Sequence, residues 1–377
     1  MKKIYNTYIS FLESLPRRHQ FFKMLIAEKI ALRKKQQLVK TIVWDEDEDK
    51  RFDFFWRKNY KKITDKGHKL FQYFNGVFHE DYMPDFLYAT EVETKMNSYN
   101  YAKVYSDKSL TEVLYKNKSN ALLPTTYLLN VNGVYYDCNR NIVDKESART
   151  ILLSLNEAVI KPILDGNSGK GVIVGVFDDN GYDSEHKFNI MSLLETDHLN
   201  YIVQEKIIQS RDLNSLFPNS INTFRVITYI VNSRIKIAPV SLRMGTGKSK
   251  LDNIHAGGLV VGVDMENEVL LKMAYKLGYS NSDLKYDTHP DTNTVFHNYK
   301  ISGVKSILDA AIKLHGQTPH IGIISWDFTL NHENVPVLIE ANYIGQSVWF
   351  PQIVNSAPIF NDDTKEILNF IRNERAN

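Results

Sequence analysis

Two carboxylates and one amide near the end of the chain are the side chains best suited to hold a metal ion. Asp327, Glu340 and Asn342 lie on two apolar runs in the segment ISWDFTLNHENVPVLIEANY. If a β-hairpin turns at residues 331–334, Asp327 lies opposite Leu338, and the two-residue period of strands places the three side chains on one face. Such oxygen ligands suit Mg²⁺, which retains waters and also binds nucleotide phosphates. A register shift of one residue would separate them.

The neighbours of these carboxylates favour a cation. Asp327 and Glu340 are flanked by Trp326, Phe328 and Ile339, so strand pairing here would bury them. A buried carboxylate without a cation or hydrogen-bond donors is costly. The alternative is that both carboxylates pair with lysine or arginine at the end of a sheet.

A glycine-rich loop earlier in the chain is a candidate phosphate clamp. In AVIKPILDGNSGKGVIVGV the loop joins two apolar runs, and Lys161 ends the first of them. Glycines let backbone N–H groups approach a triphosphate closely, and a lysine adds a point charge. It is not a P-loop, because Gly171 follows Lys170 where a hydroxyl is required. A glycine-rich hairpin with surface lysines is the alternative. The loop residues assigned to phosphate binding are Gly166, Ser168, Gly169, Lys170 and Gly171.

Two further segments supply polar groups between the clamp and the hairpin. The run YIVQEKI, residues 201–207, predicts an apolar strand with Gln204 and Glu205 in its middle; a carboxylate there can accept from a ribose hydroxyl, and the strand backbone can pair with adenine. An edge strand with one solvated face is the alternative. Arg225 and Arg243 lie on later β-rich runs and can hold phosphate oxygens as charge develops, although a surface ion pair explains either one alone.

The elements that must position these residues change character along the chain. Up to about residue 115 the sequence is aromatic and charged with helical periodicity, as in residues 52–74, and after Pro124 short β-branched runs begin. Antiparallel strands with helices between them predict an α+β fold. The paired runs are 158–160 with 172–176, 224–231 with 234–243, 258–263 with 269–274, and 321–330 with 335–341, and the later helices are 301–315 and 364–371.

Composition limits the class of protein. A chain of 377 residues, 43% of them hydrophobic, can form two or three packed units. A net charge of +2 argues against nucleic acid as a partner, and a single cysteine excludes an intramolecular disulfide framework. Without an apolar run of membrane-spanning length we expect a cytoplasmic protein. Residues 17–40 predict a basic amphipathic helix, which can contact an anionic membrane surface or pack on the protein.

The motifs, taken in order, resemble the ATP-grasp superfamily: KP with a glycine loop, a strand with QE, an NTxR strand, and a D-to-ExN hairpin. The sequence is most similar to the sugar-transfer-associated ATP-grasp proteins encoded among capsule and exopolysaccharide genes, and the likeness extends upstream to FNGVFHEDYMPDFLY, YSDKSL and LPTTYLLN. It implies two α+β subdomains that clasp ATP, at residues 116–206 and 207–377, after a helical N-terminal region at residues 1–115.

The resemblance also implies roles for individual residues. Lys108 is similar to the first nucleotide-contacting lysine of the family and Lys161 to the second, and residues 166–171 match the mobile loop over the phosphates. The strand with Gln204, Glu205 and Ile207 lines adenine and ribose. The residues implied near the phosphates or the acyl group are Arg225, Arg243 and Asn253, and the implied magnesium ligands are Asp327, Glu340 and Asn342.

By resemblance, the expected activity is a ligase that uses ATP and two Mg²⁺ ions, or Mn²⁺, to join a carboxylate to an amine through an acyl phosphate. The expected partners are small molecules: a sugar uronate with an amino acid or amine, or an amino acid with an amino sugar, in surface polysaccharide synthesis. Two alternatives stay open. One is a kinase-like phosphotransferase acting on a sugar or alcohol, and the other is a non-catalytic nucleotide-binding scaffold.

Overall fold

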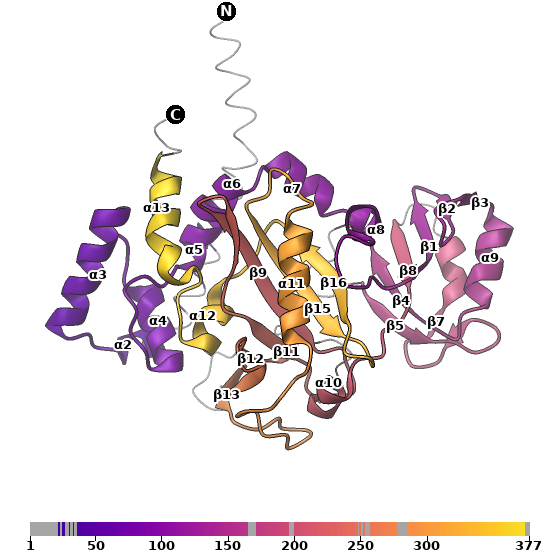
Figure 1. Cartoon of the computed structure of the whole chain (residues 1–377). Coiled ribbons are helices and arrows are strands. Elements are labelled where there is room, and N and C mark those ends of the chain that lie inside the picture. The colour runs from indigo at the N-terminus through magenta and orange to yellow at the C-terminus, as the bar shows by residue number, and fades with distance from the viewer. Residues whose placement is uncertain are drawn as a thin grey trace, which may run out of the picture.

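The computed structural model describes residues 36–164, 171–195, 200–247, 257–276 and 285–373, with residues 22, 25, 26, 30, 33, 249 and 252 between or before these ranges. Figure 1 shows the helices of residues 36–75 at one end of the molecule, a six-stranded sheet at the other, and an eight-stranded sheet between them. The predicted loop residues Gly166, Ser168, Gly169 and Lys170, and also Asn253, lie outside the described residues. Most of the predicted helix at residues 17–40 does so as well.

The N-terminal region is helical, as its periodicity predicts. Asp45 caps the longest described helix of this region with a capping box, in which its side chain accepts from the N–H of Glu48 and the Glu48 side chain accepts from the N–H of Asp45. Four acidic residues in the first turn of that helix favour its positive end. The elements are α2 (Gln36–Lys40), α3 (Glu46–Asn59), α4 (Lys66–Asn75), α5 (Asp85–Leu87), the π-helix η1 (Tyr88–Val92), α6 (Glu93–Met96), α7 (Tyr99–Tyr105), the 3₁₀ helix η2 (Lys108–Leu110) and α8 (Thr111–Tyr115).

The six-stranded sheet follows, with the order β3-β2-β1-β8-β4-β5 and antiparallel neighbours. Strand β8 lies between β1 and β4, so the edge-strand alternative for the run after residue 200 is wrong. The strand also ends at Gln204, three residues earlier than predicted. The elements are β1 (Thr126–Val131), β2 (Val134–Tyr136), β3 (Ile142–Val143), α9 (Lys145–Leu153), β4 (Glu157–Pro162), β5 (Ile173–Val176), the separate hairpin β6 (Tyr182–Asp183) and β7 (Phe188–Asn189), η4 (Ile190–Leu194) and β8 (Tyr201–Gln204).

The eight-stranded sheet has the order β14-β13-β12-β11-β9-β15-β16, and β10 also pairs with β9. The predicted hairpin at Asn232 and Ser233 is confirmed, and both residues have the positive φ that a tight hairpin turn requires. The run 234–243 forms two strands instead of one. The elements are α10 (Arg211–Leu216), β9 (Thr223–Val231), β10 (Arg234–Ile237), β11 (Ser241–Met244), β12 (Leu259–Asp264), β13 (Val269–Lys276), β14 (Lys285–Tyr286), α11 (Val304–His315), β15 (Ile323–Leu330), β16 (Pro336–Asn342), α12 (Trp349–Asn355), η6 (Asn361–Asp363) and α13 (Thr364–Asn373).

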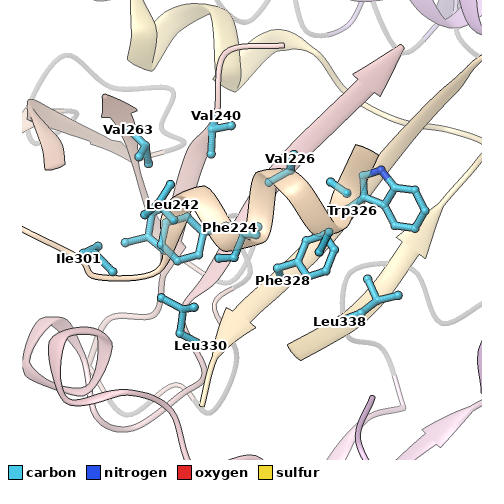
Figure 2. Close-up of a cluster of buried hydrophobic side chains, with 14 of the residues drawn as sticks. Phe224, Val226, Val240, Leu242, Val263, Ile301, Trp326, Phe328, Leu330 and Leu338 are labelled. Atoms are coloured by element: carbon cyan, nitrogen blue, oxygen red, sulfur yellow. The ribbon is translucent and has the colours of Figure 1, made fainter. Parts of the chain in front are cut away.

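Helices cover both faces of the eight-stranded sheet, so its central strands are mostly buried. Every residue of β15 is buried. On one face α11 packs over a cluster that includes Phe224, Trp326 and Phe328 (Figure 2). On the other face, Trp56 and other N-terminal side chains share a core with Tyr229 and with the C-terminal helix α13. The helical N-terminal region therefore packs on this sheet, and the molecule is an α+β protein, as predicted.

Membrane-spanning helices are not found in the described part of the chain, where no helix combines sufficient length with sufficient apolar character.

Candidate active site

The predicted carboxylate hairpin is formed by β15 and β16, but its register differs from the prediction. Leu330 pairs with Pro336 at the turn, and further along Asp327 pairs with Glu340. The predicted partner of Asp327, Leu338, lies opposite Phe328 instead. The predicted pairing is therefore wrong by two residues at Asp327.

A β-bulge explains why the predicted convergence still occurs. The register shifts between Phe328 and Asp327, so Ile339 is an extra residue in β16. Without the bulge, the one-residue difference at the turn would place Asp327 on the opposite face from Glu340. The bulge shifts the pairing by one more residue, which restores the alternation. The carboxylates of Asp327 and Glu340 therefore lie on the same face of the hairpin, opposite each other on neighbouring strands. The Asn342 side chain lies on the same face, where its Nδ2 is 3.4 Å from Oδ2 of Asp327.

Two arginines from neighbouring strands meet at Asp327, whose side chain is only 5% exposed. Arg225 lies opposite it in β9, with Nε 2.8 Å from Oδ1, and an Nη atom of Arg243 in β11 lies 3.2 Å from Oδ2. The 2.8 Å contact lacks hydrogen-bond geometry, so Arg225 Nε and Asp327 Oδ1 are buried without a hydrogen-bond partner among the described residues. Oδ1 of Asp327 thus keeps a lone pair for a further ligand.

Glu340 lies nearer the surface and faces a cleft between the two sheets. Its Oε1 is 3.0 Å from Nζ of Lys108, and its side chain is 32% exposed. Lys161 from β4 and Gln204 from β8 line the same cleft. Burial lowers the pKa of Lys161 to about 8. The charge of Lys108 lowers this pKa further, whereas the charge of Glu340 opposes the decrease. Two lysines opposite one carboxylate give the cleft an excess of positive charge, which suits a phosphate chain.

The ion-pair alternative for the carboxylates is therefore realised in this structure, since both have cationic partners. Metal binding by Asp327, Glu340 and Asn342 stays a prediction. The donor set nevertheless fits Mg²⁺: the three oxygen-bearing side chains converge, and Asp327 Oδ1 has no hydrogen bond among the described residues. Within the described ranges no group of three or more His, Cys, Asp and Glu side chains is placed to hold an ion. An ion here would thus depend on phosphate and water oxygens as well, which is usual for Mg²⁺.

The predicted adenine strand contributes less than expected. Of its three assigned residues, Gln204 lines the cleft of the described structure. The Glu205 carboxylate instead accepts the N–H of Thr125 at 3.1 Å, just beyond the end of β8. Ile207 is half-buried beyond the strand end. The carboxylate of Glu205 therefore has a structural partner before any ribose is considered.

The first strand of the predicted phosphate clamp reaches the cleft. Strands β4 and β5 pair as predicted, with Ile160 opposite Ile173, and Lys161 near the end of β4 lines the cleft. Gly171 begins the described chain after the loop with a φ of 78°, the left-handed conformation that favours glycine. The glycine-rich segment thus leaves and rejoins the sheet beside the two lysines.

Sequence reasoning missed four residues that support the site. Thr223 accepts from Nε and an Nη atom of Arg243 at 3.1 and 2.7 Å, and Asp252 lies 3.4 Å from the same Nε. Ser325 accepts from Arg225 at 2.9 Å. Alternation within their strands could have placed Thr223 and Ser325 on the site face, because each is two residues from a predicted site residue.

Arg140 is the fourth and comes from the turn between β2 and β3. It lines the cleft, donates to the carbonyl oxygen of Ser109, and lies 3.7 Å from Glu112. Its φ of 67° places it in the left-handed region. Its neighbours Asn139 and Asn141 are common turn residues, and nothing in this stretch of sequence signals chemistry.

Comparisons with known proteins point to one family. A family model described as sugar-transfer associated ATP-grasp matches residues 87–368. No curated protein matches the sequence. Among solved structures, N5-carboxyaminoimidazole synthetase from Staphylococcus aureus in complex with ADP is similar over 67% of this chain and 48% of its own, with 9% identity and a TM-score of 0.39.

The structures of two ligases match this chain with similar identity and TM-score. The D-Ala:D-Ser ligase from Enterococcus faecalis matches 74% of this chain and 64% of its own, with 11% identity and a TM-score of 0.42. D-alanyl-alanine synthetase A from Vibrio cholerae matches 72% and 66%, with 13% identity and a TM-score of 0.42. The chain thus spans between about half and two thirds of the length of these solved structures.

Proposed function

Because the chain belongs to the sugar-transfer associated ATP-grasp family, we propose that it is an ATP-dependent ligase that joins a carboxylate to an amine. The observation that carries the proposal is the cleft between the sheets, where Lys108 and Lys161 face Glu340 beside the pair of Asp327 and Arg225. Cations that converge on a cleft bind a polyphosphate, and adjacent carboxylates bind the ions that accompany it.

The residues on the two sides of the cleft have different roles in this proposal. Lys108, Lys161 and the loop at residues 166–171 bind the phosphates of ATP, and Gln204 with the chain that follows it borders the adenine. Asp327, Glu340 and Asn342 hold Mg²⁺, which neutralises negative charge on the phosphates when bound. Arg225 and Arg243 lie beside this set and face the position of the transferred phosphoryl group.

The proposed reaction has two balanced steps. A carboxylate oxygen of the substrate attacks the γ-phosphorus in line; an O–P bond forms while the bond to the β-phosphate oxygen breaks, and ADP leaves. The amine nitrogen of the second substrate then attacks the acyl carbon, phosphate departs, and the nitrogen loses a proton to give an amide. Lys161, Arg225 and Arg243 stabilise charge on the transferred group, and no protein nucleophile is required.

The family description supports a sugar-linked substrate. We propose that the pair is a sugar uronate with an amino acid or amine, or an amino acid with an amino sugar, used in surface polysaccharide synthesis in the cytoplasm.

We also propose that the basic segment at residues 17–40 contacts a membrane surface. Eight of its residues are basic and one is acidic, and the side chains of Ile26 and Ile30 are at least half exposed. Its end packs on the protein, since Leu38 and Val39 are buried against other N-terminal residues and the eight-stranded sheet.

ADP release tests the function. The full chain is incubated with ATP, Mg²⁺ and paired uronic-acid sugars and amino acids or amines, and ADP is measured. We expect release that depends on both substrates, and hydroxylamine should trap the acyl phosphate as a hydroxamate. A stable phosphorylated sugar would instead identify a phosphotransferase, and ATP binding without turnover in any pair would identify a scaffold.

A further inference from the structure

The segment that follows the last predicted metal ligand is held by helices from the N-terminal region. Strand β16 ends at Asn342, and residues 343–348 have no regular structure. The N–H of Gly345 donates to Glu93 at 2.9 Å and the N–H of Gln346 to the other Glu93 oxygen at 3.0 Å. The N–H of Val348 donates to Asp85 at 2.8 Å. Residues about 250 positions earlier in the sequence thus bind the backbone of this segment.

Asn97 extends the attachment to the hairpin itself. Its amide nitrogen donates to the carbonyl oxygens of Ile323 and Tyr343, at 2.7 and 2.8 Å. Its side-chain oxygen accepts from the N–H groups of Gly322 and Ile323, both at 2.9 Å. All four hydrogen-bonding positions of the amide are used, so Asn97 joins the start of β15 to the end of β16.

Glu93 is the most unusual member of this group because it is a nearly fully buried carboxylate, 2% exposed. Each of its two oxygens accepts one backbone N–H, from adjacent residues. Gly345 has a φ of 73°, the left-handed conformation that brings these two N–H groups to the same side. Burial of a charged group is costly unless its hydrogen bonds are made, and the two backbone N–H groups of this segment supply them.

We propose that Glu93 is a positioning residue for the nucleotide and metal site, because it fixes the backbone immediately beyond Asn342. This inference rests on the proposed function. The contacts of the Asn342 side chain are long, 3.3 Å to the Ser325 carbonyl oxygen and 3.4 Å to Asp327. Its orientation therefore depends on the backbone that carries it. Ligands must be held within a fraction of an ångström to bind an ion well, and outer residues supply that restraint.

The protonation of Glu93 gives the proposal a second readout. Burial raises the pKa of Glu93 to about 7, while the two N–H donors oppose the rise and Asp85 adds to it. Among the described residues, the other charged or titratable groups near this site are Tyr88, whose hydroxyl donates to Gln346, and Arg225 in β9, whose charge opposes the rise in the pKa of Tyr88. A protonated carboxyl group keeps one good acceptor oxygen, so the attachment of the segment weakens as the pH falls below about 7.

Glu93→Gln tests the proposal in the full chain, because an amide has one acceptor oxygen and its NH₂ group opposes the second N–H. At pH 8 we measure amide hydrogen exchange of residues 343–348 without ligand, and the affinity for ATP with and without Mg²⁺ by calorimetry. We expect faster exchange at Gly345 and Gln346 and an affinity for ATP with Mg²⁺ lowered about tenfold. The affinity for ATP alone should change little. Lowering the pH to 6 should weaken ATP binding with Mg²⁺ more in the natural protein than in the variant.

Two further variants control this experiment. Glu91→Gln changes a carboxylate on the same helical segment whose lysine partner is 4.0 Å away, and should leave both readouts unchanged. Asp85→Asn loosens the other end of the segment. It should change the exchange rate and the affinity for ATP with Mg²⁺ in the same direction, but by less, and it provides the test if Glu93→Gln does not fold. Faster exchange with unaltered ATP and Mg²⁺ affinity would overturn the positioning role, as would unaltered exchange. If the natural protein itself binds no ATP with Mg²⁺, the proposed function fails and this inference with it.

Discussion

The two sheets carry the charges of the candidate site in different ways. In the eight-stranded sheet, the charges are largely buried and balance one another, because Asp327 pairs with Arg225 and Arg243 and Asp252 pairs with Arg243 as well. In the six-stranded sheet, Lys161 faces the cleft, and its nearest opposite charge, Glu340, lies on the other side. The first region is fixed by its own packing, whereas the charge balance of the second depends on what occupies the cleft.

This difference teaches which substitutions should separate stability from function. A buried group whose partner is removed costs folding energy, because the remaining charge is unpaired. A group at the cleft surface is screened by solvent, so its removal affects mainly the ligand. The two regions should therefore respond differently to changes that look alike in the sequence.

The largest effect is expected for Asp327→Asn. The amide cannot neutralise Arg225 and Arg243, so the unfolding free energy should fall by about 3–5 kcal/mol. ADP release should also be lost. Denaturant unfolding measures the first change and a coupled ADP assay the second. A variant as stable as the natural protein would show that the arginines do not need this carboxylate.

Glu340→Gln should give a comparable loss of activity without the loss of stability. ADP release should fall on the order of 10³-fold if the side chain binds the ion that accompanies ATP. The unfolding free energy should stay within about 0.5 kcal/mol, because the group is partly exposed and its pairing with Lys108 is screened. Thermal unfolding of the two carboxylate variants side by side makes the comparison. Retained activity in both would exclude the proposed metal site.

Lys161→Met should lower the affinity for ATP about ten- to hundredfold, which corresponds to the loss of one charge-assisted contact. The natural protein should also bind ATP more weakly as the pH rises through about 8, because the lysine loses its charge there. Lys161→Arg stays charged and should remove that pH dependence. Calorimetric titrations at pH 7 and pH 9 distinguish the cases. An identical pH profile in the arginine variant would assign the effect to another group.

A buried histidine beside the eight-stranded sheet should make the unfolding free energy fall at acid pH. Trp326 donates to Thr228 at 2.8 Å, and Thr228 contacts Nδ1 of His315, whose other ring nitrogen lies 3.0 Å from the carbonyl oxygen of Ile321. Burial lowers the pKa of His315 to about 4 from an ordinary value of 6.5, so its stabilisation is present above pH 6.5 and is lost as the pH falls through about 4.

His315→Gln is the matching variant. Between pH 7 and pH 5 the natural protein should lose about 2 kcal/mol more unfolding free energy than the variant. Urea unfolding at the two pH values measures this difference. Equal losses would mean that His315 titrates normally in the folded protein.

The smallest effect is expected for a surface ion pair between β4 and the chain that follows β8. Lys206 and Glu157 are 2.7 Å apart, with side chains 36% and 44% exposed. A double-mutant cycle of Lys206→Met and Glu157→Gln should give a coupling of about 0–1 kcal/mol, which salt should reduce. A coupling near that of the Asp327 group would contradict the contrast between the two sheets.

Much of the site was predictable from the sequence because its signals are local. Lys161, the glycine-rich loop and the strands on either side of it lie within 19 residues, and the match of the family model confirms the resemblance based on the order of such motifs. The α+β class also followed from paired apolar runs and their turns. The contacts of Arg140 and Glu93 were not predictable, because their partners lie in distant elements.

The residue types at the site and the strands that carry them were thus determined by the sequence alone, since alternation and turn residues act over a few positions. The tertiary structure decided how the strands align. Phe328 packs opposite Leu338 in the core while Asp327 faces Glu340, and both conditions hold only with one extra residue between them. The bulge lets Phe328 and Leu338 join the core that α11 covers, and no local pattern in the hairpin specifies it.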